Sequence, residues 1–286
     1  MADTRRLIVT ADDFGASPEV NAAVEQAHLG GILTAASLMV GGDAAGDAVE
    51  RARRLPGLGV GLHLVLVEGR PLLPPEQIPA LVDGNGQFRS DMVRTALTIF
   101  ALPSARRQLA AEIDAQFAAF AATGLKLDHV NAHKHFHLHP TIASAILRAG
   151  KRHGMTAMRA PIEPPAVISA IDGERRSAGI EHLWAKVLRR RLRRAGVTVP
   201  DQVFGLAWSG ALTAPKLLAL LDHLPPGLTE IYAHPAQGPY PGSAPGYRYA
   251  EEFAALTDPL AKAAVSRNGL RLGRFADFDG TAGERT

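Results

Sequence analysis

Short runs of β-branched and other apolar residues alternate with longer stretches of helical periodicity along most of this chain. Residues 7–10, 34–40 and 59–64 have the length and composition of buried strands, and helical spacing of apolar residues follows the first two of them. Strands that alternate with helices build parallel sheets, because each helix carries the chain back to start the next strand. The alternation therefore predicts an α/β fold.

The pattern continues far enough to predict the number of units. Further strands are expected at 127–133, 155–159, 203–207, 230–234 and 270–272. Expected helices span 17–29, 44–55, 91–100, 104–122, 141–153, 214–221 and 251–267. Seven or eight parallel strands fit a single distorted (β/α) barrel of the TIM type. Because the alternation lapses over 160–200, we expect one domain spanning 1–286 with an insertion or lid after the fifth strand.

Composition narrows the classes of function. Cysteine is absent, so disulfides, thiolate metal sites and cysteine nucleophiles are excluded. The 31 basic and 28 acidic residues give a net charge of only +3, which argues against nucleic-acid binding. Asp12 and Asp13 interrupt the first apolar stretch, and no uninterrupted apolar run reaches the roughly 18 residues of a membrane span. We expect a cytoplasmic protein, with peripheral contact at the inner membrane left open.

Polar residues that can do chemistry fall at the ends of the expected strands. Asp12 and Asp13 follow the first strand, His63 lies in the third, and His234 ends a later one. Each has an ordinary structural interpretation when taken alone, as a turn carboxylate or a hydrogen-bonded core histidine. The carboxyl ends of parallel strands meet at one face, so together these residues predict an active site there.

A cluster of histidines after the fourth expected strand points to a metal. Five of the eleven histidines lie between His129 and His139, at every second position except 131. On an extended segment this spacing would place the side chains on one face, and neutral imidazole is a common ligand of divalent metals. The cluster therefore predicts a metal site that uses nitrogen and oxygen ligands.

These motifs resemble those of a known family. Residues 10–15 (TADDFG), 61–63 (GLH) and 128–137 (DHVNAHKHFH) are similar to the three motifs of the YdjC-like carbohydrate deacetylases, which include chitooligosaccharide deacetylases. The resemblance runs from about Leu7 to Arg274. It implies Asp13, His63 and His133 as metal ligands and Asp12 as catalytic base. It also implies His234 as general acid.

A sugar would be recognised by aromatic faces and by polar groups that pair with its hydroxyls. We expect substrate contacts from Phe14, Asn131, His135, His137 and Tyr240. Asn131 stands where many relatives have aspartate, which excludes a charged role there and leaves a hydrogen bond to a ligand or to the substrate. The expected cofactor is one divalent metal ion, zinc or magnesium; a carboxylate with two imidazoles suits zinc.

The full run of motifs, including 34–40 and 65–71, looks most like the hopanoid-biosynthesis-associated deacetylases. That resemblance implies an acetylglucosaminyl hopanoid as substrate, and deacetylation of soluble chitooligosaccharides is the alternative. The partner is thus an N-acetylated amino-sugar glycolipid or oligosaccharide, and a homodimer stays open. Other metal-dependent hydrolases, acting on phosphoesters or cyclic amides, are a further alternative.

A basic helix is expected at 181–195, within the predicted insertion. One side carries apolar residues and the rest is rich in arginine and lysine; the apolar residues are Leu183, Trp184, Val187, Leu188 and Leu192. Such a helix can lie on anionic lipid as a peripheral membrane contact. It can equally pack on the barrel with solvated arginines, so a membrane-surface binding protein without catalysis also stays open.

Overall fold

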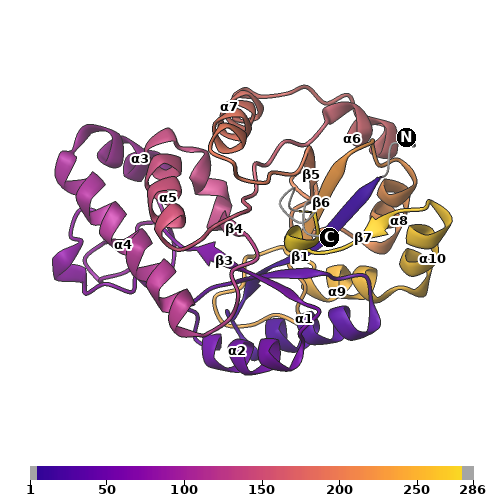
Figure 1. Cartoon of the computed structure of the whole chain (residues 1–286), viewed down its shortest axis with the longest axis horizontal. Coiled ribbons are helices and arrows are strands. Elements are labelled where there is room, and N and C mark those ends of the chain that lie inside the picture. Colours follow the sequence, from indigo (N-terminus) through magenta and orange to yellow (C-terminus); the bar gives the residue numbers. More distant parts are fainter. Residues whose placement is uncertain (1–4, 279–286) are drawn as a thin grey trace, which may run out of the picture.

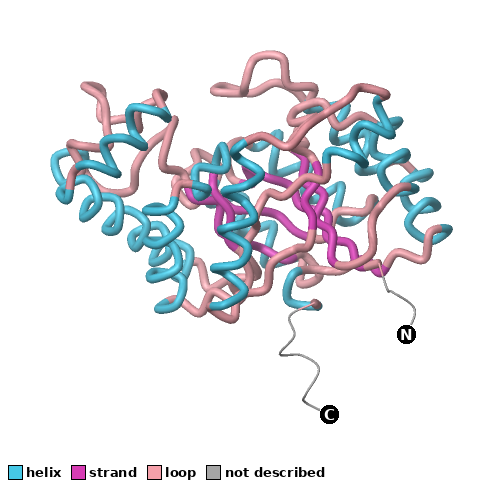
Figure 2. Tube along the Cα trace, turned by 90° about the horizontal axis from the view of Figure 1, so that it is seen from above, coloured by secondary structure: helices cyan, strands magenta, loops and turns pink. Residues whose placement is uncertain are grey.

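A curled parallel sheet runs through the middle of the protein, and helices surround it (Figures 1 and 2). The computed structural model describes residues 5–278. Every strand pairing in the sheet is parallel, and the order is β4-β3-β2-β1-β6-β5, with β7 paired to the start of β1. The strands are β1 Arg6–Phe14, β2 Ala35–Leu38, β3 Gly59–Leu64, β4 Val130–Ala132, β5 Gln202–Phe204, β6 Leu228–Ala233 and β7 Arg271–Leu272. The α/β fold and the distorted barrel are confirmed.

Helices cover the outside of this sheet. In Figure 1, α3, α4 and α5 lie at one end of the molecule and α8, α9 and α10 at the other. The helices are α1 Pro18–Gly30, α2 Ala45–Arg54, α3 Met92–Ala101, α4 Pro103–Ala122, α5 Pro140–Arg152, α6 Pro165–Asp172, α7 Ile180–Arg194, α8 Ala214–Asp222, α9 Tyr249–Thr257 and α10 Pro259–Arg267. Short 3₁₀ turns are η1 Pro75–Gln77, η2 His133–Leu138 and η3 Phe275–Asp277.

Local sequence explains why the first helix begins where it does. The Ser17 side chain accepts a hydrogen bond from the backbone N–H of Val20, and Pro18 occupies the first helical position, where a missing N–H does no harm. Val20 and Val24 then fall on the buried face of α1. This cap fixes how the chain leaves the carboxyl end of β1, where Asp12 and Asp13 lie.

The barrel is distorted where β4 faces β5. The expected fifth strand at 155–159 is present only as isolated parallel bridges, Val130 with Met158 and Ala157 with Thr198. Val203 then donates to the carbonyl of Ile162 at 2.9 Å, which joins this segment to β5. Prolines follow at 161, 164 and 165, and a proline has no N–H for a strand ladder. The barrel is therefore closed between β4 and β5 by isolated bridges and single hydrogen bonds, without a regular strand. We call this region the seam between β4 and β5.

Two predicted elements differ from the structure because of local breaks. The expected helix 251–267 is two helices, α9 and α10, since Pro259 ends the first and Asp258 caps the second by accepting from Leu260 N at 2.8 Å. The expected strand 127–133 is reduced to β4, and the chain turns into η2 at His133. The later histidines therefore do not alternate along one extended face, as the sequence pattern suggested.

The segment 160–200 contains α6, which the sequence analysis did not predict, and the basic helix α7. Buried side chains of α7 pack toward the barrel, and the helix contacts α5 and η2. A role for this segment as a lid stays a prediction. No helix within residues 5–278 combines the length and the apolar character needed to span a bilayer.

Candidate active site

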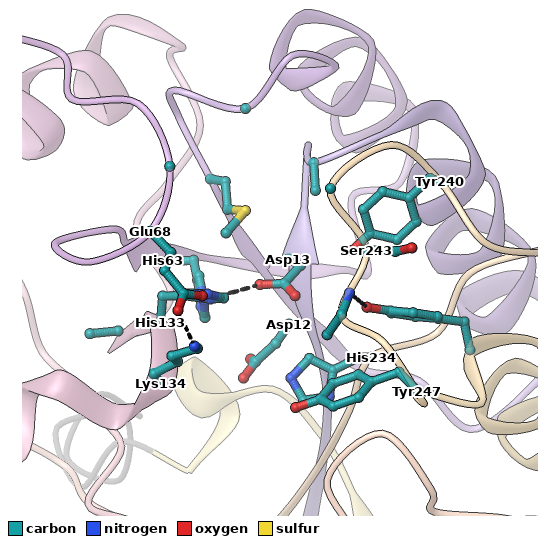
Figure 3. A pocket seen from close by; sticks show the side chains of 18 of the residues that line it. Asp12, Asp13, His63, Glu68, His133, Lys134, His234, Tyr240, Ser243 and Tyr247 are labelled. Carbon is teal, nitrogen blue, oxygen red and sulfur yellow. Dashed lines mark hydrogen bonds and ion pairs between the residues drawn. The ribbon is translucent and has the colours of Figure 1, made fainter. Parts of the chain in front are cut away.

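A cavity of about 830 Å³ opens at the carboxyl ends of the strands. The acidic pair Asp12 and Asp13 lies in the middle of this cavity, with histidines of β3 and η2 on one side and His234 on the other (Figure 3). The predicted site residues that line it are Asp12, Asp13, His63, His133, His135, His234 and Tyr240. The structure therefore brings together residues from β1, β3, η2, the end of β6 and the loop that follows β6.

Three side-chain atoms form a nearly equilateral triangle at the cavity floor. Asp13 Oδ1 lies 3.2 Å from His63 Nε2 and 3.4 Å from His133 Nδ1, and the two nitrogens are 3.4 Å apart. Asp13 Oδ1 is buried, and no group in the described part of the chain forms a hydrogen bond with it. Ligands about 2.1 Å from a tetrahedral ion are separated by about 3.4 Å, so the triangle fits a divalent ion.

Asn131 sets the orientation of one of these candidate ligands. Its Nδ2 donates to Asp12 Oδ1 at 2.9 Å and to Ser37 Oγ at 2.7 Å, so its Oδ1 is left to accept from His63 Nδ1 at 2.7 Å. With its proton on Nδ1, His63 presents the lone pair of Nε2 to Asp13 and His133. The register of the sheet places Asn131 directly beside His63.

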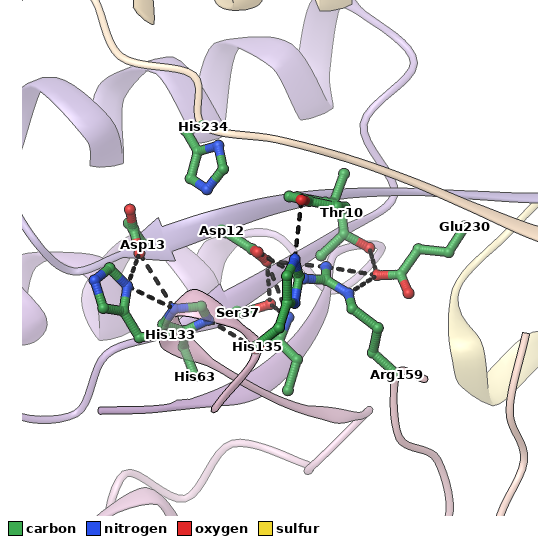
Figure 4. Close-up of polar contacts among 12 residues, drawn as sticks. Thr10, Asp12, Asp13, Ser37, His63, His133, His135, Arg159, Glu230 and His234 are labelled. Carbon is green, nitrogen blue, oxygen red and sulfur yellow. Dashed lines mark hydrogen bonds and ion pairs between the residues drawn. The ribbon is translucent and has the colours of Figure 1, made fainter. Parts of the chain in front are cut away.

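Asp12 is held by a buried arginine. Arg159 Nη1 donates to Asp12 Oδ2 at 2.6 Å and Nη2 donates to Oδ1 at 3.0 Å. Ser37 Oγ also donates to Oδ1, at 3.1 Å. On its other side Arg159 donates to Glu230 Oε1 from Nε at 3.0 Å and from Nη2 at 2.7 Å (Figure 4). One guanidinium thus joins two buried carboxylates.

These contacts control the charge of Asp12. Burial alone would raise the pKa of its carboxyl, but the positive charge and hydrogen bonds of Arg159 hold that pKa well below its usual value. Burial would conversely lower the pKa of Arg159, yet Asp12 and Glu230 raise it. Asp12 is therefore ionised throughout the physiological pH range.

Arg159 and Glu230 are site residues that were not predicted from the sequence, although a signal for them exists. Glu230 lies inside a strand whose six residues are all buried, and Arg159 is completely buried at the end of an apolar run. A charge inside such a segment needs a partner of opposite sign, because isolated buried charges are strongly unfavourable. A charge inside an apolar run is therefore a signal that a partner exists, although the run does not say which residue that partner is.

His234 approaches from the end of β6. Its ring lies between those of Tyr232 and Tyr247, with centroid separations of 5.6 and 5.2 Å. The backbone N–H of His234 donates to Glu252 Oε2. Its ring Nδ1 lies 3.9 Å from the same oxygen and is buried without a hydrogen-bond partner. Because Nδ1 is buried beside Glu252, the other ring nitrogen, Nε2, is the one left to exchange a proton with a group bound in the cavity that His234 lines.

The predicted substrate contacts divide into two groups. His135 and Tyr240 line the cavity, and His135 Nε2 contacts Tyr232 Oη at 2.9 Å. Phe14, Asn131 and His137 are completely buried and are absent from the cavity wall. Their placement does not support the predicted substrate contact, because core packing and, for Asn131, the bond to His63 occupy them. Burial lowers the pKa of His137 to about 3, so this ring is neutral.

The backbone is strained around the cavity. Four non-glycine residues within 5–278 have positive φ: Asp13 at 63°, Glu68 at 47°, Lys134 at 52° and His135 at 53°. All four line the cavity, and Lys134 and Glu68 form an ion pair between two different loops. Left-handed backbone in residues with a Cβ costs about 1 kcal/mol or more each and concentrates at functional sites.

Comparison with known proteins gives consistent matches. A family model described as "YdjC-like protein" matches residues 6–267. A carbohydrate deacetylase of Geobacillus stearothermophilus is 32% identical over 96% of this chain and 98% of its own length. A carbohydrate deacetylase of Mus musculus is 31% identical over 96% and 95%. A chitooligosaccharide deacetylase of Yersinia pestis (strain Pestoides F) is 28% identical over 95% and 98%.

A solved structure shares the fold. The crystal structure of a putative cellobiose-phosphate cleavage protein from Enterococcus faecalis V583 superposes with a TM-score of 0.77. It is 23% identical, and the match covers 96% of this chain and 99% of that one. The arrangement of strands and helices is therefore common to both chains along nearly their whole length.

Proposed function

The chain belongs to the YdjC-like family, and from that premise we propose that it is a carbohydrate N-deacetylase that works with one divalent metal ion. Its relatives carry the names carbohydrate deacetylase and chitooligosaccharide deacetylase, which makes it a hydrolase of the deacetylase class. The observation that carries the metal-dependent mechanism is the triangle of Asp13, His63 and His133. Three segments far apart in the sequence meet there, and each turns one ligand atom toward a common centre.

Zinc is the ion that we propose. One carboxylate and two imidazoles are typical of catalytic zinc sites, which keep an open position for water or substrate. The atom separations of 3.2 to 3.4 Å match a tetrahedral set better than an octahedral magnesium set, for which adjacent ligands lie about 3.0 Å apart. When bound, a zinc ion would lower the pKa of water and polarise an amide carbonyl.

Hydrolysis of an N-acetyl group needs two proton transfers. A base must take a proton from the attacking water, and an acid must give one to the nitrogen as the C–N bond breaks. Asp12 is ionised and lines the cavity, and among residues 5–278 its Oδ2 accepts a hydrogen bond only from Arg159 Nη1. We assign the base to Asp12. Arg159 fixes its position and charge, and it also makes Asp12 a weaker base than a free carboxylate.

His234 is assigned as the acid. It stands across the cavity from His63 and His133, with Asp12 and Asp13 between them (Figure 3). Its Nδ1 is buried beside Glu252, so the proton offered to the substrate is the one on Nε2. Transfer of that proton to the sugar nitrogen releases the amine, while the acyl carbon keeps the water oxygen and departs as acetate.

The narrower substrate that we propose is an N-acetylglucosaminyl hopanoid. Its support is the similarity of the motifs at 34–40 and 65–71 to the hopanoid-biosynthesis-associated deacetylases. The second of these motifs contributes Glu68 and Arg70 to the cavity wall. Soluble chitooligosaccharides are the alternative, and the name of the Yersinia relative favours them.

The test is an acetate-release assay with N-acetylglucosaminyl lipid and diacetylchitobiose side by side. Asp12→Asn should retain bound metal and lose activity by about 10²-fold or more, as expected for removal of a general base. His133→Ala should lose both metal and activity. His153→Ala is the matched control, because His153 packs on Phe117 outside the cavity, and it should retain both. Acetate from neither substrate, or equal rates in all four proteins, would reject the mechanism.

A further inference from the structure

Helix α7 carries two apolar faces. Ala185, Leu188 and Leu192 are buried against the rest of the protein. A second set lies on the outside: the exposed fractions are 73% for Ile180, 62% for Leu183, 43% for Trp184 and 46% for Val187. These four positions are spaced i, i+3, i+4 and i+7, so they form one continuous outer stripe. The single apolar side expected from the sequence is therefore split, because Leu188 and Leu192 point inward.

The basic residues of α7 are divided in the same way. Arg189 donates to the carbonyl of Asp201 at 2.6 Å, and Arg193 donates to the Asp201 carboxylate at 2.7 Å. Arg191 donates to Ser144 Oγ at 2.7 Å. Three further basic residues are exposed, and within residues 5–278 they have neither a hydrogen bond nor an ion pair: Lys186, Arg190 and Arg194. Three cations thus remain unneutralised beside the outer stripe.

The outer stripe begins close to the mouth of the active site. A smaller cavity of about 420 Å³ is lined by Glu181 and His182 in the first turn of α7. Leu206 lines both this cavity and the main one. Helix α7 also contacts η2, the turn that carries His133 and His135. A surface that covers the stripe would therefore lie next to the entrance of the catalytic cavity.

We propose that α7 docks the protein on an anionic lipid surface, with Ile180, Leu183, Trp184 and Val187 inserted at the boundary between headgroups and acyl chains. An apolar stripe with a tryptophan, flanked by unneutralised cations, matches the charge and polarity of such a surface. Another exposed apolar face, formed by Val93, Leu97 and Phe100 on α3, has one basic residue on its own helix, Arg94, and the nearby Arg106 of α4 is engaged by the carbonyls of Ile99 and Phe100. Charge complementarity therefore singles out α7. This inference rests on surface chemistry and not on the deacetylase reaction.

Vesicle binding by the full chain tests the proposal. Wild type should sediment with vesicles of phosphatidylcholine and phosphatidylglycerol, and binding should weaken on raising salt. It should bind vesicles of phosphatidylcholine alone far more weakly. The triple variant Lys186→Glu/Arg190→Glu/Arg194→Glu should lose at least roughly 100-fold in affinity, because each basic residue near an anionic surface contributes about a factor of five. Leu183→Ser/Val187→Ser should also lose binding.

Control variants distinguish vesicle binding through α7 from nonspecific adsorption to lipid and from effects on catalysis. Val93→Ser/Leu97→Ser on α3 should bind vesicles as wild type does. Trp184 fluorescence should shift to the blue on binding, and the shift should be absent in Trp184→Phe. Melting curves by circular dichroism confirm that each variant folds, and acetate release from soluble diacetylchitobiose should be unchanged by all α7 variants. The proposal would be overturned if wild type did not bind anionic vesicles, or if the α3 variant lost as much binding as the α7 variants do. Either result would count against it whatever rate of acetate release is measured.

Discussion

At the scale of single residues, Asn131 determines how His63 faces the cavity. Its amide hydrogens are committed to Asp12 and Ser37, so its oxygen can only accept the proton of His63 Nδ1. A neutral amide in this position orients the imidazole without adding negative charge beside Asp12. The same side chain therefore links the proposed base to a proposed metal ligand.

Removing that amide should weaken metal binding. Asn131→Ala frees the ring of His63 to rotate or to change tautomer, and loss of such an orienting bond costs about 10- to 100-fold in metal affinity. Zinc titration by calorimetry with competing chelator measures this. Ser37→Ala is the matched control, since Ser37 bonds to Asp12 and Asn131 but to none of the three ligands, and its effect should be several-fold smaller. Equal affinities in Asn131→Ala and wild type would contradict the role of this amide.

His137 should make stability depend on pH. Its pKa is about 3 in the folded protein, against an ordinary value of 6.5, because burial disfavours the charged ring. Between these two values the unfolded chain binds a proton that the folded chain does not. The free energy of unfolding therefore falls as pH drops from about 6.5 toward 3, by up to about 1.4 kcal/mol per pH unit from this residue.

The measurement is urea unfolding at pH 6.5 and pH 5, with chelator present so that no metal contributes. His137→Phe cannot bind the proton and should lose about 2 kcal/mol less than wild type over this interval. His223→Gln, at an exposed position after α8, should behave as wild type does. Identical pH dependence in His137→Phe and wild type would show that the ring is not held neutral.

At this scale the sequence predicted those site residues whose side chains are typical of metal binding or acid–base catalysis. Asp12, Asp13, His63 and His133 were placed together because each follows or ends an expected strand. Arg159 and Glu230 were not, because the partner of a buried charge lies far away in the chain and spacing alone does not pair the two. The inward burial of Phe14 and His137 also depends on how the chain turns after β1 and β4, which no periodicity encodes.

At the scale of elements, regular helices and strands were predictable, and their interruptions were not. The strand β3 matches its expected bounds, because 59–64 is apolar and has a glycine at its start. The turn η2 contradicts the alternating histidine pattern, since Lys134 and His135 adopt positive φ that residue type does not favour. Such backbone conformations are imposed by the surrounding structure, so the local sequence does not predict them.

Two glycines illustrate how elements are held together. A Cβ on Gly61 in β3 would lie 2.5 Å from the ring of His129, which is completely buried and stacked on Phe275. Gly61→Ala should therefore lower the free energy of unfolding by about 1–3 kcal/mol through overpacking. Gly46 lies in the first turn of α2, and a Cβ added there would meet nothing within 4 Å.

Gly46→Ala is thus the matched control, and it should raise the free energy of unfolding by about 0.5 kcal/mol. Denaturant titration of both variants beside wild type measures the difference. A Gly61→Ala protein as stable as Gly46→Ala would mean that β3 and His129 are not packed as closely as described.

At the scale of the whole molecule, the proposed ion joins separate parts of the barrel. Its ligands come from β1, β3 and the start of η2, so a bound ion should resist unfolding of the entire sheet. The alternation of strands and helices predicted this barrel, whereas the irregular seam between β4 and β5 follows from prolines and long-range contacts beyond any local pattern.

Removing metal should therefore lower the melting temperature. At 100 times the dissociation constant, a ligand stabilises by about 2.7 kcal/mol, which corresponds to roughly 4–5 °C for 286 residues at about 2.1 cal/mol/K of unfolding entropy each. Calorimetric scans with zinc and with chelator measure the difference in wild type. His63→Ala should melt at one temperature under both conditions, while His153→Ala should shift as wild type does. A wild type that melts identically with and without zinc would argue against the site.

The position of β1 has a consequence for how this protein is made. Leu7 pairs with Thr229 of β6 on one edge and with Leu272 of β7 on the other, so β1 is synthesised long before these two neighbours. β2 can pair early with the second half of β1, but the edge that β6 will cover stays open to wrong partners until β6 is made. High contact order of this kind slows folding and lengthens exposure to aggregation. Chaperones that shield a nascent chain would therefore act most usefully on the first few strands of this one.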